Sequence, residues 1–302
     1  MAIGDVYEAT VGDCTDIYYV DTGMYDVPEY GSVYVLDTER PAVVDTGIGT
    51  NYERVLDTMA DVGIAPEELE VVAVTHVHLD HAGGAGFLAE ACPNATVYVH
   101  EIGARHLVDP DLLWEGTKGA VGDQFEFYTE PEPVPEDRIV ELTDGDTVSL
   151  GDRELEARHA PGHAPHQVVF HDAAIDAVFT GDAAGIYTPS SGELHVTSPP
   201  VNFDLEQALD DLAMIRDLDP ETLLYAHFGP APTGDRLETY ADILTEWVAA
   251  IEEQRAELGD DEAVVEHFVD PVETPAVWGE RKAKAETAMN VRGVLVALDR
   301  EK

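Results

Sequence analysis

The chain of 302 residues is long enough to bury a substantial core, and its composition is ordinary for a globular protein except in charge. Sixty-two acidic side chains stand against sixteen basic ones, which gives a formal net charge of −46. A charge of this size opposes folding by self-repulsion unless salt screens it, so we expect a protein of a salt-accumulating, halophilic cytoplasm. The first 280 residues contain no basic stripe, which argues against a nucleic-acid partner and against an anionic membrane surface.

The two cysteines, Cys14 and Cys92, lie far apart and indicate neither a disulfide framework nor a zinc or redox motif. No segment reaches the roughly 18 apolar residues of a membrane span, and the first residues lack the basic and apolar regions of a signal peptide. We therefore expect a cytoplasmic protein with no membrane partner. The sequence leaves the oligomeric state open, with a homodimer as one alternative.

The first half of the chain alternates short β-like runs with amphipathic helical patterns. Strands are predicted near residues 16–20, 32–36, 42–44, 71–74 and 96–99, and helices near 51–62, 82–91 and 101–108. Residues 109–138 are rich in proline, glycine and acidic side chains, and the proline-rich run 130–136 suits neither a helix nor a central strand. This segment is expected to be a surface insertion that could cap a site.

The second half begins with β-like runs and ends in helical patterns. Strands are predicted near 146–150, 154–158, 168–171, 177–180 and 222–226, and helices near 204–218, 237–258 and 281–298. Two β-rich halves that each carry helices indicate an α/β protein with two sheets packed face to face and helices outside. We expect one catalytic domain over residues 1–232 and a helical C-terminal region over 233–302.

A dense cluster of metal-ligand side chains follows the apolar strand predicted at 71–74. Side chains alternate between the faces of a β-strand, so His76 and His78 are expected to point to the same side, where their imidazoles could bind one ion. Asp80 and His81 follow where the strand gives way to a helix, and they offer a carboxylate and an imidazole to a second ion. Four such residues within six positions strongly indicate a metal site. Glycines at 83, 84 and 86 would let neighbouring backbone approach closely.

Other candidate ligands each follow a predicted strand. His163 lies on the turn Ala160-Pro161-Gly162-His163, Asp182 comes just after an apolar strand, and His227 ends the next one. Asp45 occupies a similar strand end, where it more plausibly orients a ligand by accepting its hydrogen bond than binds metal itself. Neither a serine-nucleophile elbow nor a nucleotide-binding loop is present, so the metal site carries the functional prediction.

The order of these motifs resembles that of the metallo-β-lactamase-fold hydrolases, which have Asp, then HxHxDH, then His, Asp and His. The resemblance covers about residues 14 to 228 and implies an αββα sandwich with the site at the sheet edges. It also implies that one metal ion is bound by His76, His78 and His163, the other by Asp80, His81 and His227, and that Asp182 bridges them. Two zinc ions are expected, with iron or manganese as alternatives.

The segment Ala160-Pro161-Gly162-His163 resembles the corresponding turn of the glyoxalase II group. This resemblance implies a hydroxide shared by two metal ions that attacks a thioester or ester carbonyl, with Asp80 placed to accept its proton. Two alternatives stay open on the same scaffold. One is a lactonase, and the other is a mononuclear iron enzyme that oxidises persulfides.

The substrate is expected to be a small molecule, and an anionic thioester fits one further pattern. Six of the sixteen basic residues lie in the last 22 positions, where Arg281 and Lys282 could bind a carboxylate-bearing substrate. The alternative is a solvated helix face that neutralises its acidic surroundings. Tyr187, five residues after Asp182, could donate a hydrogen bond to a substrate oxygen, although a packing role is the stronger expectation.

Overall fold

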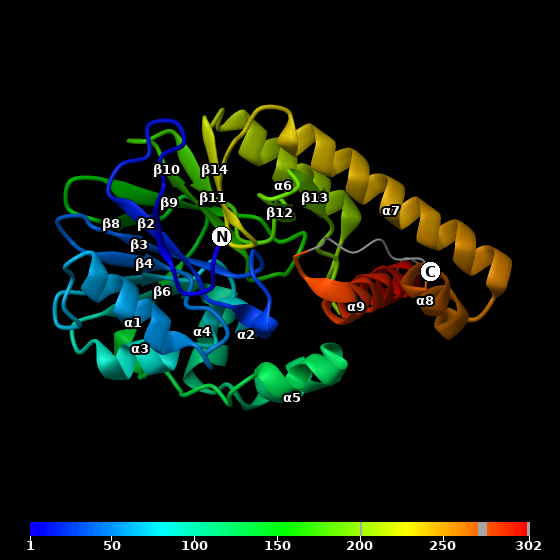
Figure 1. The fold of residues 1–302 in the computed structure, drawn as a ribbon, viewed down its shortest axis with the longest axis horizontal. Helices are drawn as coiled ribbons and strands as arrows, with labels where there is room; N and C mark the ends of the chain where they lie inside the picture. The colour runs from blue at the N-terminus through cyan, green and yellow to red at the C-terminus, as the bar shows by residue number, and fades with distance from the viewer. Residues whose placement is uncertain (200, 271–276, 301–302) are drawn as a thin grey trace.

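The computed structural model describes residues 1–199, 201–270 and 277–300, and within them two mixed β-sheets pack face to face between layers of helices. In Figure 1, α1 (Tyr52–Asp61) and α3 (Ala85–Ala91) lie outside the first sheet, and α6 (Leu205–Asp217) and α7 (Arg236–Leu258) lie outside the second. The fold is therefore the α/β sandwich that the sequence predicted, and it carries a helical C-terminal region.

The first sheet is formed by the N-terminal half of the chain. Its seven strands follow the chain order, and β4, β5, β6 and β7 pair in parallel. The strands are β1 (Val6–Glu8), β2 (Ile17–Asp21), β3 (Ser32–Leu36), β4 (Ala42–Val44), β5 (Val71–Ala73), β6 (Thr96–His100) and β7 (Ile139–Leu142).

The second sheet has six strands in the order β15-β14-β11-β10-β9-β8. β10 runs antiparallel between β9 and β11, and β11 pairs in parallel with β14, so β9, β11 and β14 all point the same way. The strands are β8 (Thr147–Ser149), β9 (Glu154–His159), β10 (Val168–Asp172), β11 (Ala177–Phe179), β14 (Thr222–Tyr225) and β15 (Gly229–Pro232), and a separate hairpin pairs β12 (Ile186–Thr188) with β13 (Glu193–His195).

The strands are apolar on both faces because each sheet is covered on both sides. In β3, Tyr34 and Leu36 join the core between the sheets, while Val33 and Val35 join the core beneath α1 and α3. In β10, Phe170 faces the inter-sheet core and Val169 faces the helices of the second layer. Burying a side chain of this size contributes about 1.5–3 kcal/mol. Because alternate side chains of a strand face opposite sides of the sheet, each strand stabilises both the core between the sheets and the core under its own helices.

The C-terminal helices extend the second helical layer. α7, α8 (Asp261–Val269) and α9 (Gly279–Arg300) contact one another, and their apolar faces join the core cluster that also contains β14. Within the described residues, no helix combines the length and the apolarity that a bilayer crossing would require.

The insertion at 109–138, for which the sequence predicted a surface segment without assigning helices, is partly helical. It contains the α-helix α5 (Asp111–Ala120) and the short 3-10 helices η2 (Gly122–Phe127) and η3 (Glu136–Arg138). The glycines at 116 and 119 lower helix propensity and hide the pattern, but the apolar residues of α5 still recur at helical spacing. The run 130–135 is neither helix nor strand, as predicted.

Two shorter elements complete the description near the site. α2 (Leu79–Ala82) and α3 replace the single helix predicted at 82–91, and α4 (Glu101–Val108) matches its prediction. The predicted need for glycine is confirmed at all three positions, because an added Cβ would collide with a backbone carbonyl: that of Leu79 at Gly83, of Thr46 at Gly84 and of Glu132 at Gly86. The 3-10 helix η1 (Met24–Asp26) lies just before Tyr30, whose backbone carbonyl contacts His227 at the site.

Candidate metal centre

The candidate ligands gather at one edge of both sheets because each follows the carboxyl end of a strand. His76 to His81 follow β5, His163 follows β9, Asp182 follows β11 and His227 follows β14. The two sheets are tied together at this edge, where the Val168 amide donates to the Thr75 carbonyl over 2.8 Å. Gly181, with φ of +48°, supplies the left-handed turn that brings Asp182 to the site.

The histidine pair is not held by a strand, which corrects the geometry assumed from the sequence. β5 ends at Ala73, and residues 74–78 form a loop that runs into α2. The strand ends early because the Asp45 carboxylate accepts hydrogen bonds from the amide and hydroxyl of Thr75. The two rings nevertheless meet, since His76 Nε2 lies 3.1 Å from His78 Nδ1.

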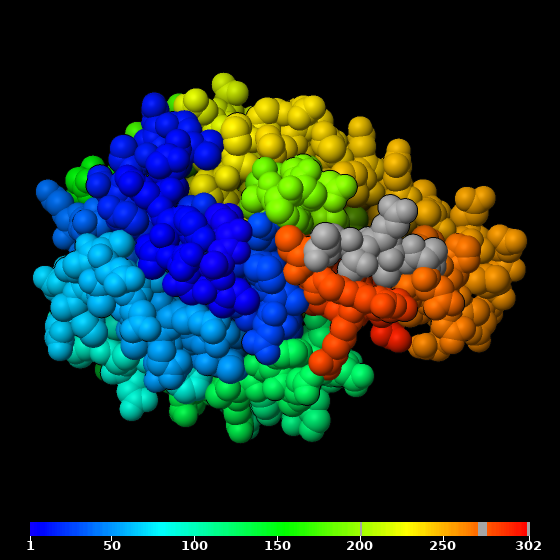
Figure 2. Space-filling model, viewed as in Figure 1, coloured from blue at the N-terminus to red at the C-terminus, as the bar shows by residue number. Residues whose placement is uncertain are grey.

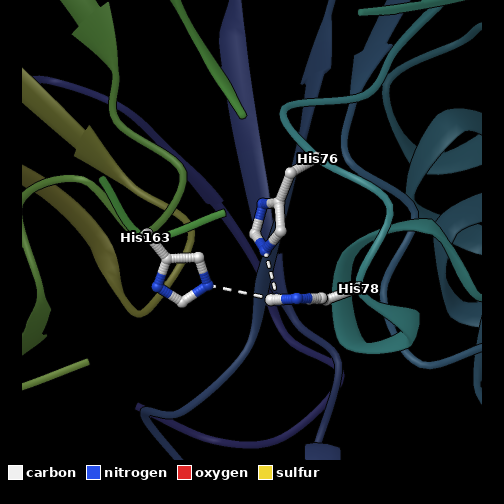
Figure 3. Close-up of side chains that lie close together, drawn as sticks. All are labelled: His76, His78 and His163. Atoms are coloured by element: carbon white, nitrogen blue, oxygen red, sulfur yellow. Dashed lines mark hydrogen bonds between the residues drawn. The ribbon is translucent and has the colours of Figure 1, made fainter. Parts of the chain in front are cut away.

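Three imidazoles form the first candidate metal group, and Figure 3 shows their rings converging. His163 Nε2 lies 3.1 Å from His78 Nδ1, which completes a triangle with His76. Burial lowers the pKa of His163 to about 3 and the pKa values of His76 and His78 in the same direction, with neighbouring histidines adding to the effect. These rings are therefore neutral near pH 7, and their lone pairs are available to a metal ion.

The second group combines carboxylates and imidazoles. Asp80 Oδ2 lies 3.8 Å from Nε2 of both His81 and His227. Asp182 lies between the groups, because its Oδ2 is 3.3 Å from His163 Nε2 while its Oδ1 is 3.1 Å from His81 Nε2 and 3.4 Å from His227 Nε2. The two oxygens of one carboxylate thus face the two histidine sets.

The two candidate metal groups differ in charge. Burial opposes ionisation of Asp182, yet His163, His81 and His227 outweigh it and hold the pKa of that carboxyl well below its usual range. Burial likewise disfavours a charged His81, but Asp182 and Asp80 raise the pKa of its imidazole well above the usual value. His81 therefore holds a proton that an incoming metal ion would displace.

A metal pair fits this donor set by two observations. His81 Nε2 and Asp182 Oδ1 are buried and lack a hydrogen-bond partner among the described residues, and both point into the cluster. The donors are imidazole nitrogen and carboxylate oxygen, which zinc and related divalent ions prefer. In each group the candidate ligand atoms lie within 4.8 Å of one another, close enough for one ion to bind them all.

Two ligands are oriented from behind by hydrogen bonds. His81 Nδ1 donates to Asp45 Oδ2 over 3.0 Å, which directs His81 Nε2 into the site. His227 Nδ1 donates to the carbonyl of Tyr30 over 2.7 Å, which does the same for His227. Tyr30 was not singled out in the sequence, because a backbone acceptor leaves no signature in residue type.

A cavity of about 440 Å³ opens above the ligands. Asp80, Asp182 and His227 line its floor, α4 and α5 form one side, and Glu286, Met289 and Asn290 of α9 form another. Its volume suits a small-molecule substrate. Glu286 and Asn290 were not predicted as site residues, since only the fold brings them next to the cluster.

Three residues proposed as substrate contacts do not line this cavity. The Tyr187 ring packs at 5.5 Å from that of Tyr225. The Arg281 guanidinium lies 2.5 Å from Glu126 at the surface. Lys282 is buried, and its ammonium donates to Glu286 over 2.7 Å.

Two histidines that flank the His163 turn differ in their placement. His159 stacks on His100 with 4.2 Å between ring centroids, away from the ligands. His166 lines the cavity, and its Nδ1 accepts a hydrogen bond from the Val77 amide at 3.4 Å. The imidazole of His166 is thus a polar group in the cavity wall beside the candidate ligands.

The family model for the metallo-beta-lactamase superfamily matches residues 26–227. A metallo-beta-lactamase fold-containing protein of Sulfurisphaera tokodaii is 28% identical over 222 residues, which cover 72% of this chain and 79% of that protein. An acyl-coenzyme A thioesterase of Gallus gallus is 30% identical over 181 residues, covering 55% of this chain and 62% of the thioesterase. A hydroxyacylglutathione hydrolase of Synechococcus is 26% identical over 196 residues, covering 64% of this chain and 61% of the hydrolase.

Solved structures agree with the fold. An archaeal metallo-beta-lactamase superfamily protein from Sulfolobus tokodaii superposes with a TM-score of 0.70 at 22% identity, covering 96% of this chain and all of that one. A related protein from Thermus thermophilus superposes with a TM-score of 0.63 at 22% identity, covering 90% of this chain and 89% of that one. Both superpositions cover a larger share of the chain than the family model does.

Proposed function

Because the chain belongs to the metallo-beta-lactamase superfamily, we propose that this metal-dependent hydrolase cleaves thioesters with two divalent ions, zinc in preference to iron or manganese. His76, His78 and His163 would hold one ion, Asp80, His81 and His227 the other, and Asp182 would bridge them. The observation that carries the proposal is the position of Asp182, whose oxygens face both histidine sets.

Bound ions would supply Lewis acidity, which polarises a carbonyl and lets water ionise near neutral pH. The protein's own contribution begins with Asp80. Its side chain is 21% exposed against 6% for Asp182, so it is the carboxylate that substrate and water reach. The charges of His81 and His227 outweigh burial and lower the pKa of Asp80, so it is ionised at neutral pH and can accept a proton from attacking water.

A thioester substrate is supported by two relatives. One is named an acyl-coenzyme A thioesterase and another a hydroxyacylglutathione hydrolase, and each matches this chain over about half of its length or more. The chain spans 62% and 61% of those two proteins, so the match covers only part of each. We propose the same carbonyl chemistry here, within a catalytic domain over residues 1–232 and with residues 233–302 supplying the α9 wall.

We propose that an anionic group of the substrate is bound by Arg105 rather than by the C-terminal helix. Arg281 and Lys282 are engaged by Glu126 and Glu286 and do not line the cavity. Arg105 of α4 lines it, and its Nε donates a hydrogen bond to Nε2 of His106 over 3.2 Å. A carboxylate or phosphate at the cavity mouth would therefore meet a guanidinium in an otherwise acidic protein.

The test is metal analysis after purification in concentrated KCl, followed by a screen of thioesters, lactones and phosphodiesters. We expect two equivalents of zinc and fastest hydrolysis of thioesters. His78→Ala should remove one equivalent and reduce thioesterase activity by at least about a hundredfold. His267→Ala, an exposed histidine on α8, is the matched control and should retain both.

Two outcomes would replace the proposal. Full activity in His78→Ala would show that the histidine cluster is not the site of hydrolysis. One equivalent of iron with oxygen consumption on persulfides would identify the mononuclear dioxygenase alternative, and a preference for lactones would identify a lactonase.

A further inference from the structure

The cavity above the ligands changes character along its length. At its floor lie carboxylates and imidazoles, whereas the wall formed by α5 is apolar or small. Five residues of α5 and the one after it line the cavity, at spacings of one, three and four that place them on one face of the helix. They are Leu112, Leu113, Gly116, Thr117, Ala120 and Val121.

This face of α5 is only partly covered by the protein, since Leu113 packs against the core beneath α1 and α3 while its other residues face the cavity. None of the helix residues is buried, and the Leu112 side chain is 75% exposed. The charged residues Asp111, Glu115 and Lys118 do not line the cavity. An apolar helix face held over a cavity, with its charges turned elsewhere, indicates an apolar ligand rather than a core contact.

Neighbouring segments complete the apolar wall and hold α5 in place. Ile102 of α4, Met289 of α9 and Val201 contribute apolar side chains to the cavity. The Trp114 ring lies 4.4 Å from that of Phe125 in η2, and Arg281 joins η2 to α9 through Glu126. Figure 2 shows the green segment that contains α5 and η2 next to the orange α9, with which η2 makes contact.

We propose that the α5 wall binds the unbranched acyl chain of the thioester, so that the enzyme prefers acyl groups with several methylenes. The inference rests on the proposed thioesterase function and adds its substrate class. The cavity is continuous from the ligands to α5, so an acyl carbon at the floor leaves its chain against the α5 wall. In the reaction, the oxygen of one water bonds to the acyl carbon and the C–S bond breaks, giving a carboxylic acid and a thiol.

The chain offers a matched pair of variants. Gly116 and Gly119 both lie in α5, and a Cβ added to either meets no atom within 4 Å, but only Gly116 is among the cavity-lining residues. Leucine is a better helix former than glycine, so neither substitution weakens the helix. Gly116→Leu would fill the acyl channel, and Gly119→Leu would leave it open.

The first measurement is kcat/KM in concentrated KCl for acetyl, butanoyl, hexanoyl and octanoyl thioesters of N-acetylcysteamine. In the unmodified enzyme, kcat/KM should rise about fourfold for each added methylene, the free energy of burying one CH₂. Gly116→Leu should lower the octanoyl value by at least about tenfold and leave the acetyl value within about twofold, whereas Gly119→Leu should change neither. Equal values for all four chains, or equal behaviour of the two variants, would overturn the proposal.

A second measurement separates this inference from the thioesterase proposal. Isothermal calorimetry on the metal-free protein would follow binding of S-butyl, S-hexyl and S-octyl thioethers of N-acetylcysteamine, which cannot be hydrolysed. Affinity that rises about fourfold per methylene and is lost in Gly116→Leu, but not in Gly119→Leu, supports the acyl channel even if no thioester is turned over. Affinity independent of chain length would overturn the channel even if acetyl thioesters are hydrolysed.

Discussion

Asp45 acts on the candidate metal centre through His81. Its carboxylate accepts from His81 Nδ1 and from the Thr75 amide and hydroxyl, so it fixes both a ligand ring and the loop that carries the cluster. Asp45 itself has φ of +59°, a conformation that asparagine also tolerates. The charge can therefore be removed without changing the backbone.

For Asp45→Asn we expect the affinity for one of two bound ions to fall by about 10- to 100-fold, because the neutral amide has one acceptor oxygen where His81 and Thr75 share two charged ones. Competition with a chromophoric chelator would measure this. Asp37→Asn, an exposed aspartate just after β3, is the control and should bind both ions normally. Unchanged affinity in Asp45→Asn would show that His81 needs no orienting carboxylate.

Asp211 links α6 to the turn that carries His163. Its Oδ2 accepts a hydrogen bond from the backbone amide of Gly162 over 2.7 Å, and its Oδ1 accepts one from the side-chain amide of Gln207 over 3.0 Å. Burial raises the pKa of Asp211 to about 6, even though these hydrogen bonds act in the opposite direction. Between about pH 4 and 6 the native state therefore binds more protons than the unfolded state, and stability falls as pH rises through that window.

Asp211→Asn should thus raise the free energy of unfolding by about 2 kcal/mol at pH 7.5 and by much less at pH 4.5. Urea denaturation in concentrated KCl at the two pH values would measure the difference. Asp210→Asn, an exposed neighbour, removes the same charge and corrects for the net charge of the chain. Equal gains from the two variants at both pH values would refute the argument.

The sequence could predict the ligand cluster because ligand chemistry depends on residue type and short spacing. It could not predict the groups that orient those ligands. The acceptor of His227 is the backbone carbonyl of Tyr30, 197 positions away, and Glu286 reaches the cavity wall from the other end of the chain. Such contacts are set by the fold, in which distant segments meet at one edge.

At the scale of elements, the strands were predicted to within a few residues where both faces are apolar, as in β3 and β4. The elements that the sequence did not predict were missed for physical reasons. The three-residue strands β1 and β13 depend on pairing partners, and α5 contains two glycines and turns its apolar face toward a cavity. Periodicity analysis assumes that apolar faces are buried on a core, whereas no residue of α5 is buried and Leu113 packs against the core only in part.

Two similar ion pairs on α9 differ in burial. Lys282 donates to Glu286 over 2.7 Å inside the protein, where Glu286 also accepts from the hydroxyl of Tyr30. Lys284 lies 2.7 Å from Glu280 at the surface. Both pairs have i, i+4 spacing on the same helix, in opposite order along it, and they differ strongly in burial.

We expect Lys282→Met to destabilise the protein by about 3 kcal/mol, because Glu286 is left charged and buried. Adding Glu286→Gln should recover most of that loss, since the second substitution removes the uncompensated charge. Lys284→Met should change stability little, because solvent screens its partner. Chemical denaturation of the four proteins measures these terms, and a double variant no more stable than Lys282→Met would contradict the account.

The net charge of −46 is a property of the whole molecule and predicts its response to salt. Screening at molar ionic strength shortens the Debye length to about 3 Å, so repulsion among surface carboxylates weakens. We expect the thermal midpoint to rise steadily between 0.1 and 2 M KCl. A midpoint that is constant or falls over this range would show that the acidic surface is not an adaptation to salt.

The seven candidate ligands lie in segments that follow strands of both sheets, four after β5 of the first sheet and three after strands of the second. Two bound metal ions would therefore cross-link the N-terminal and C-terminal halves of the chain. An ion present at a hundredfold excess over its dissociation constant stabilises the native state by about 2.7 kcal/mol. Chelation should then lower the unfolding midpoint and speed amide hydrogen exchange first where the halves meet, at Thr75 and Val168, before the outer strands respond.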